Sequence, residues 1–224
     1  MLQVGCWSGV SRFGQTDADY SFAGPPQDFE LRVGGQPQGR VRWALGGLHN
    51  QMNALAAIAA AEHVGVAPTQ AVQALGSFTN VKRRMELLGE AGGVTVYDDF
   101  AHHPTAFRLT IEGLRQQVGQ DARILAVFEP RTNTMQRGEM KALLARSLQG
   151  CDLAFCHAEG LNWDPQEALA PLGQRLRISH SIPELVQMVR QEAKSGDHVL
   201  CMSNGGFGGV HQKLLDALSK QERS

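Results

Sequence analysis

The amino-acid sequence predicts an α/β fold whose C-terminal part contains a mainly parallel sheet covered by helices on both faces. Three observations carry this prediction. From Val94 onward, short apolar runs of strand length alternate with amphipathic segments of helix length. Most of these runs are continuously apolar, as in strands that are buried on both faces. The 224 residues are 42% hydrophobic, which is enough for a sizeable buried core.

Residues 1–45 are expected to be rich in β-strands. Apolar and polar residues alternate over residues 29–33 and again over residues 40–45, and the turn-forming pair Gly34-Gly35 lies between the two runs. Alternation with a period of two places the apolar side chains on one face of a strand. The pattern therefore predicts a hairpin with one solvated face.

Two helices are predicted after this hairpin. The first covers residues 49–63, is rich in alanine and ends at Gly65. The second begins at Pro68, which suits the first position of a helix, and continues to Leu75. Residues 77–82 show neither a helical nor a strand period, so we expect a linker there.

The C-terminal part is expected to repeat strand and helix. A strand at residues 94–96 precedes a helix that opens at Pro104 and carries an apolar stripe. That stripe consists of Phe107, Ile111, Leu114 and Val118. Further strands are predicted at residues 123–128, 153–156 and 198–202, and further helices over residues 140–148, from Pro183 onward, and over residues 209–218.

Ligands of parallel sheets bind beyond the carboxyl ends of the strands. Three loops follow such ends in the predicted arrangement, namely residues 97–103, 129–136 and 203–208. We therefore expect the functional residues of the C-terminal part in these loops.

Composition and charge exclude several classes of function. The net charge is −1 and no basic stripe is present, so nucleic acid is not an expected partner. No apolar run approaches the ~20 residues of a membrane span, and the N-terminus lacks the pattern of a signal peptide. The four cysteines form no CxxC pair. We expect buried thiols in a reducing cytoplasm, and neither a zinc site nor disulfides.

The segment Tyr-Asp-Asp-Phe-Ala-His-His-Pro-Thr at residues 97–105 is the most informative in the chain. One interpretation is structural, with an Asp or a His capping the helix at Pro104. The other is functional: Asp99 accepts hydrogen bonds from a ribose, or His102 and His103 approach phosphates. A metal-dependent hydrolase using Asp98, Asp99, His102 and His103 is a further alternative, although adjacent side chains rarely converge.

Amide and arginine side chains form two more candidate sites. Asn50 and Asn53 lie three residues apart, on one face at the start of the first predicted helix. Their amides suit recognition of an adenine edge, while Asn50 alone also suits an N-cap. Residues 83–86, Arg-Arg-Met-Glu, follow the linker. An arginine there could bind phosphate or simply lie at the surface.

The last two loops offer polar side chains and glycines. Arg131 could pair with a substrate carboxylate or belong to a solvated loop. Residues 203–209, Ser-Asn-Gly-Gly-Phe-Gly-Gly, lack the GxGxxG spacing, so nicotinamide binding is not expected. Glycines would still allow a substrate to approach the backbone. The sequence contains no GxxxxGK[ST] phosphate loop and no GxSxG or HExxH motif.

Three segments in this order resemble the Mur ligase family: GLHNQMNALAA, RRME and YDDFAHHPTA. The resemblance covers nearly the whole chain. FEPRTNTM and MSNGGFGG are similar to members that add the tripeptide L-alanyl-γ-D-glutamyl-meso-diaminopimelate. DDFAHHPT is close to members that add L-alanine, although those usually have Tyr-Gly in place of Phe100-Ala101.

The resemblance implies an ATP-dependent ligase that joins UDP-N-acetylmuramate to an amino acid or peptide through an acyl phosphate. It implies that residues 1–81 are the remnant of a central ATP-binding domain and that residues 82–224 form a Rossmann-like C-terminal domain. The chain would then be part of a longer enzyme, inactive alone, with Mg²⁺ held mostly by the missing part. Domain closure about a hinge near residues 77–82 would accompany catalysis.

The resemblance also implies roles for single residues. Arg84 would reach the ATP phosphates, and Arg84 and Asp99 would be catalytic. Nucleotide contacts are implied for Asn50, Asn53, Arg84, Asp99 and His103. Peptide contacts are implied for Arg131, Asn133, Ser203 and Asn204. A non-catalytic nucleotide-binding module remains a further alternative.

Overall fold

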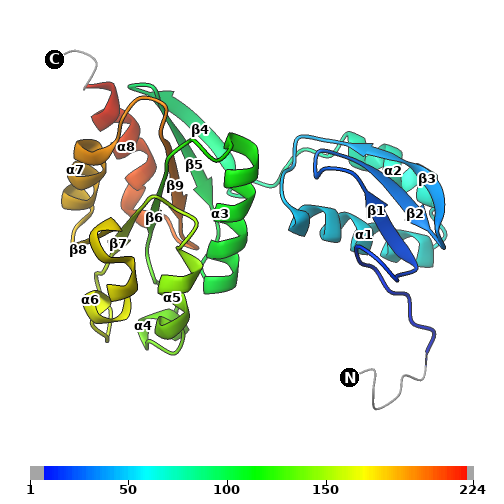
Figure 1. Ribbon diagram of the computed structural model, residues 1–224, viewed down its shortest axis with the longest axis horizontal. Coiled ribbons are helices and arrows are strands. Elements are labelled where there is room, and N and C mark those ends of the chain that lie inside the picture. Colours follow the sequence, from blue (N-terminus) through cyan, green and yellow to red (C-terminus); the bar gives the residue numbers. More distant parts are fainter. Residues whose placement is uncertain (1–7, 221–224) are drawn as a thin grey trace. The chain divides into compact units, whose positions relative to one another are not determined.

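The computed structural model describes residues 8–220 of the chain (Figure 1). The chain divides into two compact units, Met1–Asn80 and Val81–Ser224. The division falls inside residues 77–82, the segment that we expected to be a linker.

The smaller unit is an antiparallel sheet with two helices. Its sheet has the strand order β1-β2-β3. The elements are β1 (Tyr20–Ala23), β2 (Asp28–Val33), β3 (Gln36–Arg42), α1 (Leu48–His63) and α2 (Pro68–Gly76). The predicted hairpin and both helices are confirmed, whereas the short strand β1 was not expected.

The hairpin between β2 and β3 follows from its turn and its alternating pattern. Gly34 and Gly35 have φ values of 56° and 78°, which a two-residue hairpin turn of this kind requires. Phe29, Leu31 and Val41 are fully buried in a core that also contains side chains of α1 and α2. On the other face, the charged residues of β2 and β3 form ion pairs, as between Arg40 and Asp28.

The larger unit contains a six-stranded sheet in the order β4-β5-β9-β6-β7-β8. Strands β5, β9, β6, β7 and β8 are parallel, and the edge strand β4 is antiparallel to β5. The mainly parallel sheet is thus confirmed. The bounds are β4 (Glu86–Ala91), β5 (Val94–Asp99), β6 (Ile124–Phe128), β7 (Leu153–His157), β8 (Leu176–Ser179) and β9 (His198–Met202).

Helices cover both faces of this sheet, and each face has its own core. Helices α7 and α8 lie together on one side, and α3 and α5 on the other (Figure 1). The Phe107 ring of α3 packs edge-on against Phe128 of β6, with ring centroids 5.4 Å apart. The remaining elements are α3 (Pro104–Val118), α4 (Asn133–Gln136), α5 (Lys141–Ser147), α6 (Pro165–Ala168), η2 (Ala170–Arg175), α7 (Ile182–Glu192), η3 (Phe207–Gly209) and α8 (Val210–Ser219).

Three details of the sequence-based prediction were wrong. The strand predicted at residues 94–96 continues to Asp99, because residues 97–99 are buried within the sheet. Gly47, and not Asn50, is the N-cap of α1. The second strand of the predicted hairpin, expected at residues 40–45, covers Gln36–Arg42 instead.

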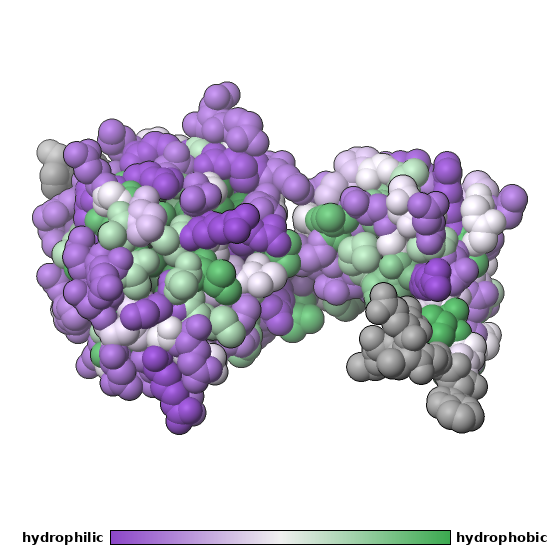
Figure 2. All heavy atoms as spheres, turned by 60° about the horizontal axis from the view of Figure 1, so that its bottom comes forward, coloured by the Kyte–Doolittle hydropathy of each residue, from purple (hydrophilic) through white to green (hydrophobic). Residues whose placement is uncertain are grey.

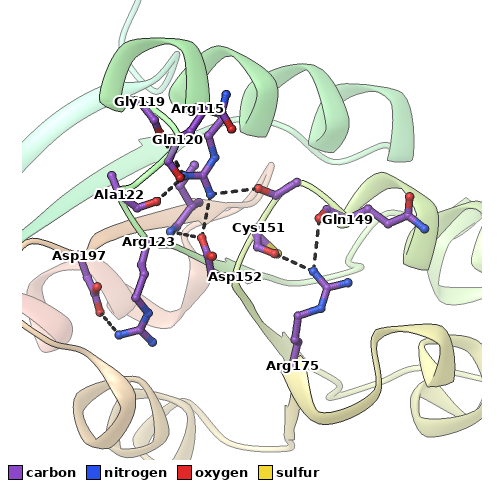
Figure 3. Close-up of polar contacts among 12 residues, drawn as sticks. Arg115, Gly119, Gln120, Ala122, Arg123, Gln149, Cys151, Asp152, Arg175 and Asp197 are labelled. Atoms are coloured by element: carbon purple, nitrogen blue, oxygen red, sulfur yellow. Dashed lines mark hydrogen bonds and ion pairs between the residues drawn. The ribbon is translucent and has the colours of Figure 1, made fainter.

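A network of arginines holds the amino-terminal edge of the larger sheet (Figure 3). The Arg115 guanidinium donates to the carbonyl oxygens of Ala122 and Gly150 and to Asp152 Oδ2 at 2.7 Å. Asp152 Oδ2 also accepts from the backbone N–H of Ile124, the first residue of β6. The loops that enter β6 and β7 are therefore fixed by polar contacts at the edge opposite the carboxyl ends.

The surface and the thiols carry few functional signals. On the face shown in Figure 2, polar residues cover most of the surface, and apolar residues reach it in limited areas. Within residues 8–220, no helix is long and apolar enough to cross a membrane.

Cys151, Cys156 and Cys201 are free and buried, and burial raises the pKa of each thiol, to about 12 for Cys151. Cys6 lies outside the described residues.

Candidate functional site

The site lies at the carboxyl ends of three adjacent strands in the larger unit. In the sheet register, Met202 at the end of β9 pairs with Asp99 of β5 on one side and with Phe128 of β6 on the other. The segments after β5, β9 and β6 therefore begin side by side. This arrangement is the usual place for a ligand in a parallel sheet.

Asp99 is buried and organises the backbone around it. Its Oδ2 accepts from the Met85 N–H at 2.8 Å, and its Oδ1 accepts from the Ala101 N–H at 2.8 Å and from Thr110 Oγ1 at 3.3 Å. Burial raises the pKa of this carboxyl group above its ordinary value, although the two backbone hydrogen bonds and Arg84 act against that effect. Both oxygens already have protein donors, which suits a positioning role.

Asp98 points to the other side of the strand and pairs with cations. Its Oδ2 accepts from Arg83 Nε at 2.8 Å. His211 Nε2 of α8 lies 3.1 Å from its Oδ1, within ion-pair distance but not aligned as a hydrogen bond. Burial opposes ionisation of Asp98, but the attraction of His211 and Arg83 outweighs it and holds the pKa below its ordinary value.

The two arginines of residues 83–86 form a turn held against Phe100. Arg83 and Met85 have φ values of 60° and 52°, a region that non-glycine residues rarely occupy. The Phe100 N–H donates to the Arg83 carbonyl oxygen at 2.8 Å. The guanidinium carbons of Arg83 and Arg84 lie 5.3 and 5.6 Å from the centroid of the Phe100 ring. Arg84 is exposed, so its charge can meet an anionic ligand.

The segment after β9 joins this turn to the segment after β6. Ser203 is fully buried, and its carbonyl oxygen accepts from Arg83 Nη2 at 2.6 Å. Its hydroxyl donates to Glu129 Oε1 and accepts from the Gly205 N–H at 2.9 Å. The same Glu129 oxygen lies 3.9 Å from Nη1 of Arg131, whose side chain is 55% exposed. One polar network thus runs from Arg83 to Arg131.

The two histidines have structural contacts. His103 is the N-cap of α3, where its Nδ1 accepts from the Thr105 N–H at 3.2 Å. His102 Nδ1 lies 2.9 Å from the Phe100 carbonyl oxygen. Because Asp98 and Asp99 face different partners, the four side chains do not converge. No group of three or more metal-binding side chains exists among the described residues. The metal-dependent hydrolase is therefore not favoured.

The remaining sequence-based candidates occupy separate places. Asn50 and Asn53 belong to α1 of the smaller unit, where Asn50 Nδ2 donates to the Gly46 carbonyl oxygen at 2.7 Å and Asn53 is exposed. Asn133 begins α4 and is exposed. Asn204 is half-buried, and its Oδ1 accepts no hydrogen bond from any described residue.

Sequence reasoning missed three members of the network, namely Arg83, Glu129 and His211. Arg83 was passed over in favour of its neighbour Arg84. Glu129 directly follows a predicted buried strand, and this position at a carboxyl end could have identified it. His211 gives no local signal, because only the packing of α8 places it beside Asp98.

The chain is similar in sequence to known proteins. Residues 83–205 match the family described as Mur ligase, glutamate ligase domain. The chain is 48% identical over 231 residues to a UDP-N-acetylmuramate--L-alanyl-gamma-D-glutamyl-meso-2,6-diaminoheptandioate ligase of Escherichia coli (strain K12), which covers 98% of this chain and 49% of the relative. It is 34% identical over 193 residues to a UDP-N-acetylmuramate--L-alanine ligase of Anaeromyxobacter sp. (strain Fw109-5), covering 82% of this chain and 42% of the relative.

A solved structure shows the same fold. A murein peptide ligase from Psychrobacter arcticus 273-4 has a TM-score of 0.71 at 36% identity, over 93% of this chain and 46% of that one. The chain spans about half the length of the curated relatives it matches. The family match covers more than half of the chain and includes the arginine turn, Asp98, Asp99, the segment after β6 and residues 203–205 after β9. This chain belongs to the Mur ligase family.

Proposed function

We propose that this chain is part of an ATP-dependent ligase that joins UDP-N-acetylmuramate to L-alanyl-γ-D-glutamyl-meso-diaminopimelate. The observation that carries the proposal is the 48% identity, over 98% of the chain, to a relative named for this activity. The relative named as an L-alanine ligase is only 34% identical. The tripeptide is therefore favoured over L-alanine as the amine substrate.

The site geometry supports a reaction between anionic substrates. In the proposed reaction, the carboxylate of the sugar acid takes the γ-phosphoryl group of ATP, giving an acyl phosphate and ADP. The peptide amine then attacks the acyl carbon, and phosphate leaves. Such a reaction needs positioned cations and no protein nucleophile. Two arginines at the carboxyl edge, Arg84 and Arg131, are exposed enough to supply these charges.

We assign one anionic group of the substrates to each of these two arginines, according to the residues that surround the arginine. Arg84 is held over Phe100 beside the buried carboxylate of Asp99, and it would contact the ATP phosphates. Asp99 would act mainly by holding the Met85 and Ala101 backbone, and its contact with a ribose stays a prediction. Nucleotide contacts of Asn50, Asn53 and His103 also stay predictions.

Arg131 fits a carboxylate of the peptide, because a guanidinium can donate two parallel hydrogen bonds to a carboxylate. Asn133, Ser203 and Asn204 belong to the segments beside it, and their peptide contacts are proposals as well. Mg²⁺ would neutralise ATP and be held mostly by other parts of the enzyme. A cytoplasmic location is supported by the free, buried thiols in the described part of the chain.

The test uses the full-length protein that contains this chain. Phosphate release is measured with ATP and UDP-N-acetylmuramate, and with either the tripeptide or L-alanine as the amine. We expect turnover with the tripeptide and little with L-alanine. We expect Arg84→Ala to lower kcat/KM about 10²–10³-fold, as for other groups that stabilise charge in a transition state. The control is Arg108→Ala, which removes an exposed arginine of α3 that pairs with Glu112 on the same helix.

Two outcomes would contradict the proposal. An unchanged kcat/KM in Arg84→Ala removes Arg84 from the site. A preference for L-alanine over the tripeptide replaces the substrate. A third outcome is tested by calorimetry with ATP on the present chain. Tight binding of ATP by this chain alone would support the alternative of a non-catalytic nucleotide-binding module.

A further inference from the structure

Gly205 lies directly against the guanidinium group of Arg131. A Cβ atom built on Gly205 would lie 2.0 Å from Arg131 Nη1 and 2.7 Å from its Cζ. Both distances are far below van der Waals contact. The backbone of Gly205 does not itself require glycine, since its φ lies outside the left-handed region. A side chain at this position would therefore meet the Arg131 guanidinium in its present position.

Glu129 and Ser203 lie next to the same contact. Glu129 is largely buried, with a side chain that is 12% exposed, and its Oε1 lies 3.9 Å from Arg131 Nη1. The Ser203 hydroxyl donates to that same oxygen and accepts from the Gly205 N–H. Ser203 thus links the Glu129 carboxylate to the Gly205 backbone, and both lie close to the Arg131 guanidinium.

The Ser203 backbone is itself anchored to the sheet. Its N–H donates to the Asp99 carbonyl oxygen at 3.1 Å, and its carbonyl oxygen accepts from Arg83. Glu129, Ser203 and Gly205, the residues next to Arg131, are therefore fixed to the ends of β5, β6 and β9. A long, half-exposed arginine side chain samples many rotamers, and contacts with fixed neighbours reduce their number.

We propose that Gly205, Glu129 and Ser203 are positioning residues that hold the Arg131 guanidinium in one orientation to bind a carboxylate of the incoming peptide. This inference rests on the proposed function for the identity of the peptide. A fixed guanidinium recognises a planar carboxylate with two parallel hydrogen bonds, and a displaced one does not. The three residues would thus determine affinity for the peptide while leaving the ATP contacts unchanged.

The first test observes Arg131 directly in the present chain. The Nε–Hε resonance of Arg131 is followed by nuclear magnetic resonance at mildly acidic pH and assigned by its loss in Arg131→Lys. We expect Gly205→Ala to shift this resonance, because the new methyl group occupies the place of the guanidinium. Gly206→Ala is the matched control: Gly206 has a φ of −74°, and a Cβ atom added there would meet no atom within 4 Å, so the resonance should stay in place.

The second test measures kinetics in the full-length protein. A displacement of about 1 Å can change rates by up to about 10²-fold, so we expect Gly205→Ala to raise the KM for the tripeptide at least tenfold. The KM for ATP should stay constant. Glu129→Gln keeps an acceptor for Ser203 but removes the charge, and it should raise the same KM by a smaller factor. In an Arg131→Ala background, Gly205→Ala should have no further effect.

The outcomes separate this inference from the proposed function. If Gly205→Ala leaves the Arg131 resonance unchanged, or raises KM equally in the Arg131→Ala background, the positioning role is wrong. If the full-length protein does not use the tripeptide, the proposed function is wrong, and the resonance still decides whether Gly205 holds Arg131. A shift with Gly205→Ala but not with Gly206→Ala supports the inference in either case.

Discussion

Replacing Arg115 by methionine removes the centre of the arginine network at the amino-terminal edge of the larger sheet. Methionine keeps most of the length and apolar volume of the side chain and lacks its charge and donors. The Arg115 side chain is only 15% exposed and donates to Asp152 and to the carbonyl oxygens of Ala122 and Gly150. We expect a loss of stability without a change of fold.

The size of the effect follows from the number of strong contacts. Hydrogen bonds that involve a charged group contribute about 1.5–3 kcal/mol each. The contacts with Ala122 and Asp152 are the short ones, and Asp152 is 41% exposed, so the lower end of this range applies. Counting these two bonds alone, we expect a decrease of about 3 kcal/mol in the free energy of unfolding. This corresponds to a fall in Tm of roughly 6–12 °C.

The assay is urea denaturation of the larger unit, followed by the fluorescence of Trp163. Trp7 and Trp43 precede this unit in the chain and are replaced by phenylalanine in every protein compared. Arg108→Met is the matched control: it changes the same charge on the same helix, but both partners of the Arg108–Glu112 pair are about half exposed. We expect a decrease of only about 0.3–0.5 kcal/mol from it.

A second measurement locates the effect. The Ile124 N–H donates to Asp152 Oδ2 at 2.8 Å, so its hydrogen exchange should accelerate in Arg115→Met and not in Arg108→Met. Equal unfolding free energies for the two variants, within about 0.5 kcal/mol, would refute the reasoning. In that case the hydrogen bonds of the network would add no stability beyond that of the bonds that the same groups form with water.

Two further predictions concern pH. Asp98→Asn should lower the unfolding free energy at pH 7 by about 2 kcal/mol, because Asp98 is buried with Arg83 and His211. Since the folded-state pKa of Asp98 lies below its ordinary value of 3.8, that contribution is present above pH 3.8 and is lost as the pH falls through the folded-state value. Urea denaturation at pH 7 and pH 3 should show the difference from wild type shrinking, and a constant difference would contradict the ion pair. A hydrogen bond to Glu62, with burial, raises the pKa of Tyr20 to about 12, so its stabilisation is present below pH 10 and is lost as the pH rises towards 12. The only other tyrosine, Tyr97, also has a raised pKa because of burial. Phenolate absorbance of the folded chain should therefore stay low at pH 10, and half of the full signal at that pH would disprove the Tyr20–Glu62 contact.

Local patterns predicted most of the elements, because helices and strands impose their periods on neighbouring residues. The stripe of Phe107, Ile111 and Leu114 predicts α3, and these side chains are buried as expected. Besides β1, two strands of the larger unit escaped prediction for physical reasons. β8 has only four residues, and β4 is an edge strand with polar residues and Gly89 in place of a continuous apolar run.

The candidate site was predicted in its location but not in its contacts. The three segments after β5, β6 and β9 are where we expected functional residues. His103 caps α3, which agrees with the structural alternative for that segment, and Asp99 turned out to be buried and hydrogen-bonded. Sequence spacing cannot show which way adjacent side chains point, so the opposite partners of Asp98 and Asp99 came only from the structure.

The sequence by itself determined the α/β class, the main helices and strands and the family, because each depends on neighbouring residues or on short ordered motifs. Only the tertiary structure decided that β9, the last strand in the chain, lies between β5 and β6. That insertion places Ser203 beside Arg83, 120 residues earlier in the chain, and places Gly205 beside the Arg131 side chain. Pairing between distant strands leaves no periodic signal in the sequence, so a site assembled by such pairing becomes visible only in the folded chain.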